Sequence, residues 1–156
     1  MSVQLLILYY SRHGSVAALA EKIAIGAQQA GAEVMLRTVP ALDGSAVGIH
    51  PHVTEQDLLD ADGFAFGSPV RFGNMAAPMK YFWDGSSSEW LNGALIGKPA
   101  CVFTSTGSMH GGNETTLVTM MLPLMHHGML IVGLPYSEPE LTSTQSGGTP
   151  YGASHI

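Results

Sequence analysis

An apolar segment that passes directly into a short polar loop is the feature that most constrains this chain. Residues 5–11 are apolar or aromatic almost throughout, which is typical of a buried strand. Residues 11–15 form the loop, and from Val16 apolar residues recur at helical spacing. This arrangement predicts an anion site, because the first N–H groups of a helix lack partners and its dipole favours negative charge. An ordinary strand–turn–helix with Ser15 as the N-cap would show the same local pattern.

The composition of this loop favours a terminal monophosphate as the anion. The loop lacks the Gly-Lys-Ser/Thr ending of a triphosphate-binding P-loop and the three glycines of a dinucleotide site. The hydroxyls of Ser11 and Ser15 and the charge of Arg12 suit a single phosphate group. No Asp ends the strand, which argues against a phospho-acceptor signalling domain. At this point the sequence resembles the flavodoxin-like family, whose first loop binds the phosphate of FMN.

Strand-like and helix-like segments alternate along the rest of the chain. The patterns predict strands at residues 5–11, 33–39, 63–67, 99–104 and 129–134, and helices at 16–30, 54–61, 77–83 and 114–127. A looser segment covers residues 84–97, and the tail from Pro135 is irregular. Such alternation predicts one α/β domain over residues 1–156, a three-layer sandwich with a parallel sheet. For five strands we expect the order 2-1-3-4-5, with ligands at the carboxyl ends of the strands.

Charge and hydropathy exclude several classes of partner. The chain of 156 residues has a formal net charge of −6 and no basic cluster, so we expect no nucleic-acid partner. Its start has no basic region and no apolar run approaches the roughly 20 residues of a membrane span, so we expect neither a signal peptide nor a membrane anchor. Cys101 lies in an apolar run and is predicted to be a buried, inert thiol, which fits a cytoplasmic location. The histidines lack metal-ligand spacing, so no metal is expected.

Later blocks of sequence carry a specific resemblance. SPVRFGNMAAPMKYF, FTSTGSMHGGNETT, MLPLMHHGMLIVGLPYSEPEL and GGTPYGAS closely resemble the WrbA-type NAD(P)H:quinone oxidoreductases, which are flavodoxin-like. The resemblance extends from the first strand to Ile156. It implies an FMN-dependent homotetramer with NADH or NADPH as co-substrate and a quinone as acceptor. The chain departs from the family between Pro40 and Thr54, where its loop is short, and after the fifth strand, where the terminal helix is missing.

The resemblance assigns FMN to three loops that the residue pattern independently places at strand ends. These are the first loop, with Ser11, Arg12, His13, Gly14, Ser15 and Val16; the second, with Pro69, Val70, Arg71, Phe72 and Asn74; and the third, with Ser105, Thr106, Gly107, Ser108, Met109, His110 and Gly111. In this family the position of His13 also contacts the nicotinamide nucleotide. The alternative is that His13 is a solvated loop side chain without a ligand. Trp90 and His126 occupy the family's ring-stacking positions over the flavin. With Phe72 they imply a slot for nicotinamide and quinone rings.

The implied activity is two-electron reduction of quinones to hydroquinones by a ping-pong mechanism. No acid–base pair is required, so no catalytic side chain is assigned. Two alternatives stay open: a flavodoxin-type electron carrier, which needs no ring slot, and an interaction protein that keeps the fold without flavin. No residue that reads the ribose stands out, so NADH and NADPH stay open as well. The apolar helix segment at residues 118–125 and a charged fraction of 12% indicate surface covered by other subunits.

Overall fold

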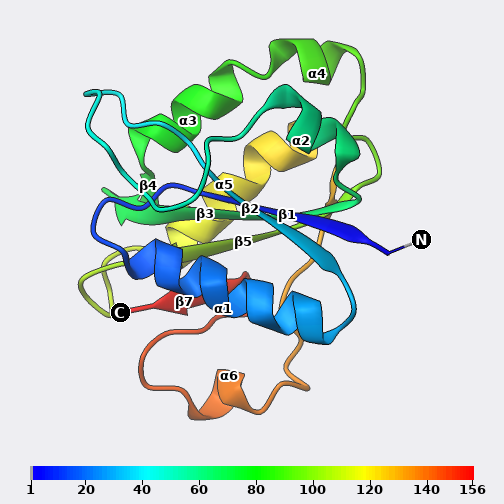
Figure 1. Cartoon of the computed structure of the whole chain (residues 1–156). Coiled ribbons are helices and arrows are strands. Elements are labelled where there is room, and N and C mark those ends of the chain that lie inside the picture. The colour runs from blue at the N-terminus through cyan, green and yellow to red at the C-terminus, as the bar shows by residue number, and fades with distance from the viewer. Residues whose placement is uncertain (1) are drawn as a thin grey trace.

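Five parallel strands form the central layer of the computed structural model, which describes residues 2–156 (Figure 1). They are β1 (Gln4–Tyr9), β2 (Glu33–Thr38), β3 (Gly63–Arg71), β5 (Pro99–Ser105) and β6 (Leu130–Ile131), in the order β2-β1-β3-β5-β6. The short strand β4 (Asn74–Met75) pairs only with the end of β3, as a hairpin. The predicted order 2-1-3-4-5 of the five main strands is therefore confirmed.

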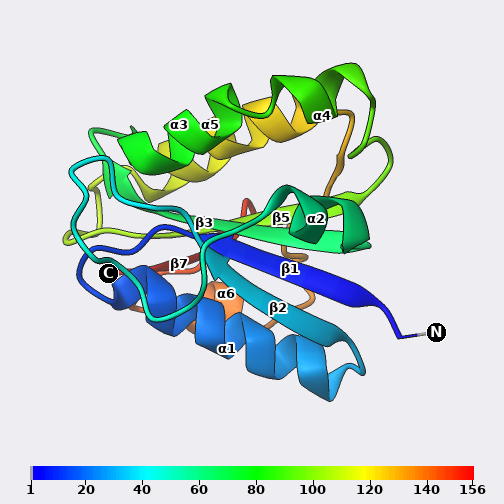
Figure 2. The ribbon, with the colours of Figure 1, turned by 45° about the horizontal axis from the view of Figure 1, so that its top comes forward.

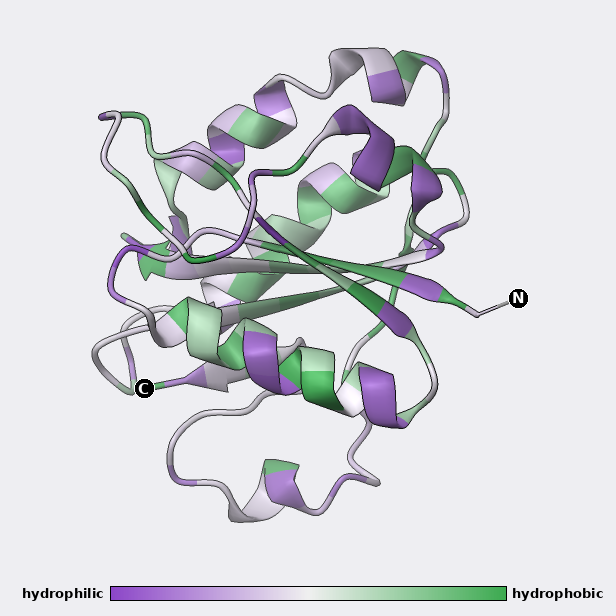
Figure 3. Ribbon diagram, viewed as in Figure 1, coloured by the Kyte–Doolittle hydropathy of each residue, from purple (hydrophilic) through white to green (hydrophobic). Residues whose placement is uncertain are grey.

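Apolar side chains of the strands point alternately into two cores. Leu6 and Leu8 belong to one core, Ile7 belongs with Tyr9 to the other, and none of the four has exposed surface. Burying an aliphatic side chain of this size contributes about 1.5–3 kcal/mol to stability. Figure 3 shows the strands as largely hydrophobic, whereas hydrophilic residues gather on α1 and α2. A sheet that is apolar on both faces requires helices on both.

Two groups of helices meet this requirement (Figure 2). On one face lie α2 (Glu55–Asp60), α3 (Ala77–Asp84), α4 (Ser87–Leu91) and α5 (Asn113–His126); on the other lie α1 (Ser15–Gln29) and the short α6 (Glu140–Ser143). The predicted helices are confirmed, and the looser segment contains α4. None of the helices in residues 2–156 is both long enough and apolar enough to cross a membrane.

Two segments distant in the sequence share the position of the fifth strand. β6 pairs with the first two residues of β5, and β7 (Ala153–His155) pairs with its last three. The predicted strand at residues 129–134 is therefore too long. The prediction of an irregular tail is wrong for residues 140–143, which form α6, and for residues 153–155, which form β7. The chain leaves the sheet after Val132 because the N–H of Leu134 donates to the carbonyl of Pro150 and Pro135 has no N–H to donate.

The side of the sheet that carries α1 is the more thinly covered one. Among residues 2–156, α1 is the one long helix on this side. Cys101 faces this side and is half-buried rather than fully buried. Burial raises the pKa of its thiol, which lowers its reactivity at neutral pH.

Docking of β7 against β5 depends on Gly152, and this is testable. A Cβ at Gly152 would overlap the carbonyl oxygen of Val102, and the φ of +154° is one that side chains rarely adopt. We expect Gly152→Ala to lower the free energy of unfolding by about 1–3 kcal/mol, measured by urea denaturation. The control is Gly26→Ala in α1, where the added methyl meets nothing within 4 Å and should add about 0.5–1 kcal/mol. Equal stability of Gly152→Ala and the parent protein would contradict the docking of β7.

Candidate functional site

The loop after β1 leaves the N-terminus of α1 open to an anion. Ser11 is buried, and its Oγ accepts a hydrogen bond from the N–H of Gly14 at 3.1 Å. Gly14 is the N-cap of α1, with a φ of +93°, and no side chain caps the helix. Ser15 is therefore the first helical residue and not the cap. The N–H groups of the first turn and the helix dipole favour a bound anion here.

A cavity of about 370 Å³ joins this loop to the ends of β3 and β5. Its lining takes residues from all three predicted loops and consists of Ser11, Arg12, His13, Ser15, Val16, Pro69, Val70, Arg71, Ser105, Thr106 and Gly107, together with His155 and Ile156. Hydroxyl groups come from Ser11, Ser15, Ser105 and Thr106. The structure therefore brings most of the first predicted loop together with parts of the other two.

The tail contributes residues that the sequence analysis missed. The N–H of Thr106 donates to the carbonyl oxygen of His155 at 3.0 Å, so β7 holds the start of the third loop. His155 and Ile156 then form part of the cavity wall. A three-residue strand is too short for a periodic pattern, so no pattern in the sequence could predict it.

Phe72 occupies a strained turn at the tip of the β3–β4 hairpin. Phe72 and Gly73 have φ values of +53° and +75°, as in the tight turns that usually take Asn-Gly. For a bulky residue this conformation costs about 1–2 kcal/mol. The side chain is also fully exposed and packs against nothing in the described chain. Strain and exposure together make the ring of Phe72 a candidate for contact with a ligand.

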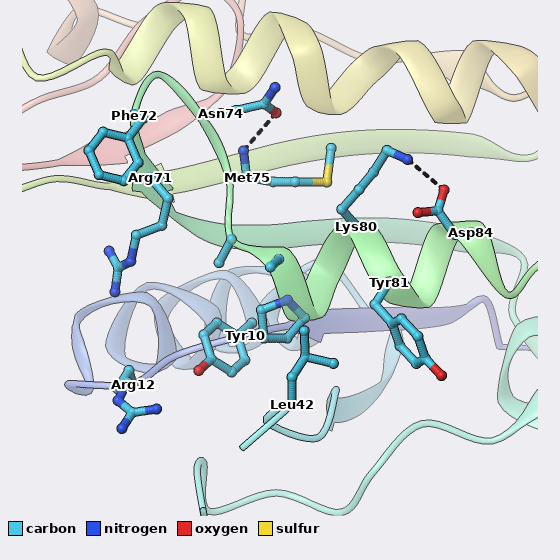
Figure 4. Close-up of a pocket in the computed structure, with 13 residues that line it drawn as sticks. Tyr10, Arg12, Leu42, Arg71, Phe72, Asn74, Met75, Lys80, Tyr81 and Asp84 are labelled. Carbon is cyan, nitrogen blue, oxygen red and sulfur yellow. Dashed lines mark hydrogen bonds and ion pairs between the residues drawn. The ribbon is translucent and has the colours of Figure 1, made fainter. Parts of the chain in front are cut away.

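The third loop lies next to this hairpin. Gly112, the N-cap of α5, approaches Gly73 so closely that a Cβ there would lie 3.0 Å from the Cα of Gly73. Four predicted residues of this loop, Ser108, Met109, His110 and Gly111, do not line the 370 Å³ cavity. The loop is closed by a hydrogen bond from the N–H of Gly111 to the carbonyl of Ser108. Phe72 and Asn74 line a separate, larger cavity beside the hairpin (Figure 4).

Trp90 and His126 lie at the other end of the fold. α5 begins beside the hairpin, and its 14 residues span about 20 Å. At its far end the carbonyl of Gly128 accepts a hydrogen bond from Gly97, just before β5 begins. Figure 1 accordingly shows α4 and the end of α5 opposite the ligand-bearing edge. Within one chain, the predicted slot of Phe72, Trp90 and His126 is not assembled.

A second cavity, of about 450 Å³, surrounds Trp90 and His126. The indole N–H of Trp90 donates to the carbonyl of His126 at 3.0 Å, which fixes the indole although it is 52% exposed. The neighbouring His127 is buried, and its Nε2 bonds the hydroxyl of Ser86 at 2.8 Å. Burial lowers the pKa of His127, so it is neutral in the folded protein at pH 7. Of these two histidines, His126 is exposed and His127 is buried.

Phe72 offers a test of whether the strained turn serves a ligand. Asn accepts a positive φ more readily, so Phe72→Asn should leave the free energy of unfolding unchanged or raise it by up to about 1 kcal/mol. Affinity for FMN, the cofactor expected from the sequence, should fall about 3-fold to 10-fold with the loss of ring stacking. Phe72→Tyr keeps the ring and serves as the control in a fluorescence titration. A stability loss without a change in FMN affinity would make Phe72 a structural residue.

Comparisons with known proteins agree with this geometry. The sequence model of the family described as NADPH-dependent FMN reductase matches residues 3–138. A flavodoxin, WrbA-like protein from Agrobacterium tumefaciens is 27% identical, with a TM-score of 0.70, over 83% of this chain and 76% of that one. Flavodoxin 2 from Bacillus cereus is 23% identical, with a TM-score of 0.64, over 83% of this chain and 80% of that one. A flavoprotein from Lactobacillus acidophilus NCFM, solved in complex with FMN, is 18% identical, with a TM-score of 0.59, over 92% of this chain and all (100%) of that one.

Proposed function

Because this chain belongs to the NADPH-dependent FMN reductase family, we propose that it is an FMN-dependent NAD(P)H:quinone oxidoreductase of the WrbA type. When bound, FMN takes a hydride from the nicotinamide nucleotide and delivers two electrons, with two protons, to a quinone. The two substrates would use one ring slot in turn, by a ping-pong mechanism. A cytoplasmic location, where NADPH is available and a single thiol stays reduced, is part of this proposal.

The observation that carries the proposal is the 370 Å³ cavity at the carboxyl edge of the sheet. Its walls present the open N-terminus of α1 and the hydroxyls of Ser11, Ser15, Ser105 and Thr106. These groups fit a phosphate monoester, since they donate hydrogen bonds without requiring a metal or a lysine. The role proposed for the first loop is to hold the FMN phosphate. The adjacent hairpin with Phe72 and the loop 108–111 would then border the flavin ring.

A second copy of the chain would complete the ring slot. Trp90 and His126 line their own cavity at the far end of α5, a helix of 14 residues that is about 20 Å long. Leu122 lines the same cavity, and with Val118 and Met125 it forms an exposed apolar stripe along α5. Spacings of four and three residues place these side chains on one face of the helix. We therefore propose that this face binds another subunit, and that each site in a homotetramer takes Trp90 and His126 from a neighbour.

Flavin binding and reduction test the proposal directly. The purified protein should show the flavin absorption spectrum, and anaerobic NADPH or NADH should bleach it. Ser15→Asp should lower FMN affinity on the order of 100-fold, because a second negative charge would face the phosphate. The variant should still fold, since an acidic residue in the first turn stabilises a helix. Ser15→Ala, which removes only the hydroxyl, should cost about 10-fold or less.

Other outcomes separate the alternatives. Bound FMN that NADPH and NADH fail to reduce would indicate an electron carrier of the flavodoxin type. A protein that takes up no FMN would be an interaction protein with the same fold. Reduction by the nucleotides without reoxidation by quinones would leave a flavin reductase with a different acceptor.

Complementation between two inactive variants tests the shared slot. Trp90→Ala keeps the FMN loops, and Ser15→Asp keeps Trp90, so oligomers that contain both should form intact sites across the boundary. Co-refolded mixtures should reach quinone-reductase activity several-fold above the sum of the separate variants. As the control, the double variant Trp90→Ala, Ser15→Asp mixed with Trp90→Ala should recover nothing. Sedimentation as a single species of monomer mass at micromolar concentration would contradict the shared slot.

A further inference from the structure

A cavity beside the β3–β4 hairpin gathers an unusual share of the chain's positive charge. It has a volume of about 810 Å³ and lies between the β3–β4 hairpin, the start of α3 and the loop after β2 (Figure 4). Arg12, Arg71 and Lys80 line it, and these are three of only six Lys and Arg residues in a chain with 12 Asp and Glu. The lining contains a single carboxylate, that of Asp84. In a protein of net charge −6, this concentration of cations marks the cavity as an anion site.

Of these three cations, Arg71 is the one free to bind a ligand. Lys80 is paired with Asp84, and Arg12 donates to the carboxylate of Asp43 at 2.8 Å. Hydrogen bonds from Ser45 and Arg12 hold the pKa of Asp43 well below its usual range, so that this pair is charged at neutral pH. Arg71 donates one Nη1 hydrogen bond to the carbonyl of Val70, and no carboxylate of residues 2–156 pairs with it. Four of its five N–H groups are left for an anion.

The cavity has a cationic side and an apolar side. Figure 4 shows the guanidinium groups of Arg71 and Arg12 on one side, with the hydroxyl of Tyr10 directed toward it. Leu42 and Tyr81 lie on the other side, and both are more than half exposed. The first residues of α3, Ala76–Pro78, add the positive end of a helix dipole to the wall. A ligand that fits carries a phosphate at one end and a planar ring at the other.

Arg12 and Arg71 also line the 370 Å³ cavity, so the two cavities share a wall. If FMN occupies the smaller cavity, a ligand in the larger one lies directly beside the flavin. We propose that the 810 Å³ cavity binds the phosphorylated adenosine half of the nicotinamide nucleotide, with Arg71 as the phosphate-binding side chain and Tyr81 beside the adenine. This inference rests on the proposed function and adds to it a site for the co-substrate.

Calorimetric titration of the FMN-loaded protein with adenosine fragments tests the inference without turnover. Adenosine 2′,5′-bisphosphate and ADP are the probes. Arg71→Gln, reloaded with FMN until its flavin absorbance matches that of the parent protein, should bind the probes about 10-fold or more weakly, since a hydrogen bond to a charged group is lost. Binding should also weaken at higher salt. The matched control is Lys22→Gln, which removes an exposed cation on α1 outside both cavities and should leave both affinities unchanged.

The pattern of loss identifies the phosphate that is bound. A loss confined to adenosine 2′,5′-bisphosphate assigns Arg71 to the 2′-phosphate and predicts a preference for NADPH over NADH. An equal loss for ADP assigns Arg71 to the pyrophosphate. Unchanged affinities of the FMN-loaded Arg71→Gln protein for both probes would overturn the inference. If the fragments bind in an Arg71-dependent way but NADPH does not reduce the flavin, the proposed function is contradicted and the cavity assignment stands.

Discussion

Ser68 has no exposed surface, and its hydroxyl accepts a hydrogen bond from the N–H of Ala76 at 2.8 Å, while its carbonyl accepts one from the hydroxyl of Thr104 at 2.7 Å. The first bond closes the base of the hairpin that carries Arg71 and Phe72. The second joins that base to β5, from which the third loop departs. Buried polar groups satisfied in this way hold a loop more firmly than packing alone, because breaking either bond would leave an unpaired group in the core.

α5 links this edge to the opposite end of the molecule. Its first turn touches the hairpin through Gly112, and its last turn carries His126 next to Trp90. Because a packed helix is stiff, the two halves of the expected ring slot are kept apart in one chain. In the proposed assembly, a second copy of the chain supplies the missing half. The exposed stripe along α5 offers the apolar surface that such an association requires.

Positive charge is concentrated at one place in an otherwise acidic chain. The chain is acidic overall, yet three of its six basic side chains gather around one cavity beside the carboxyl edge of the sheet. An acidic body repels nucleic acid and other polyanions, whereas local cations favour a small anion such as the proposed nucleotide. The hydrogen bond from Arg12 to Asp43 also joins the first loop to the loop after β2. This ion pair therefore contributes to the shape of the cavity and to its electrostatic potential.

The order of the strands, the covering helices and the position of three loops at strand ends followed from the sequence, because each rests on local patterns: apolar runs, helical spacing and helix caps. In the capping box of α2, for example, Thr54 and Asp57 lie only three positions apart. The pairing of β7 with β5 was decided only by tertiary structure, since three residues carry no period and their partners lie about 50 positions away. Local patterns also could not predict the 810 Å³ cavity, or that Phe72 and Trp90 line different cavities. A sequence pattern specifies which face a residue presents, but volumes and distances between elements arise only when the packed layers fix where each face lies.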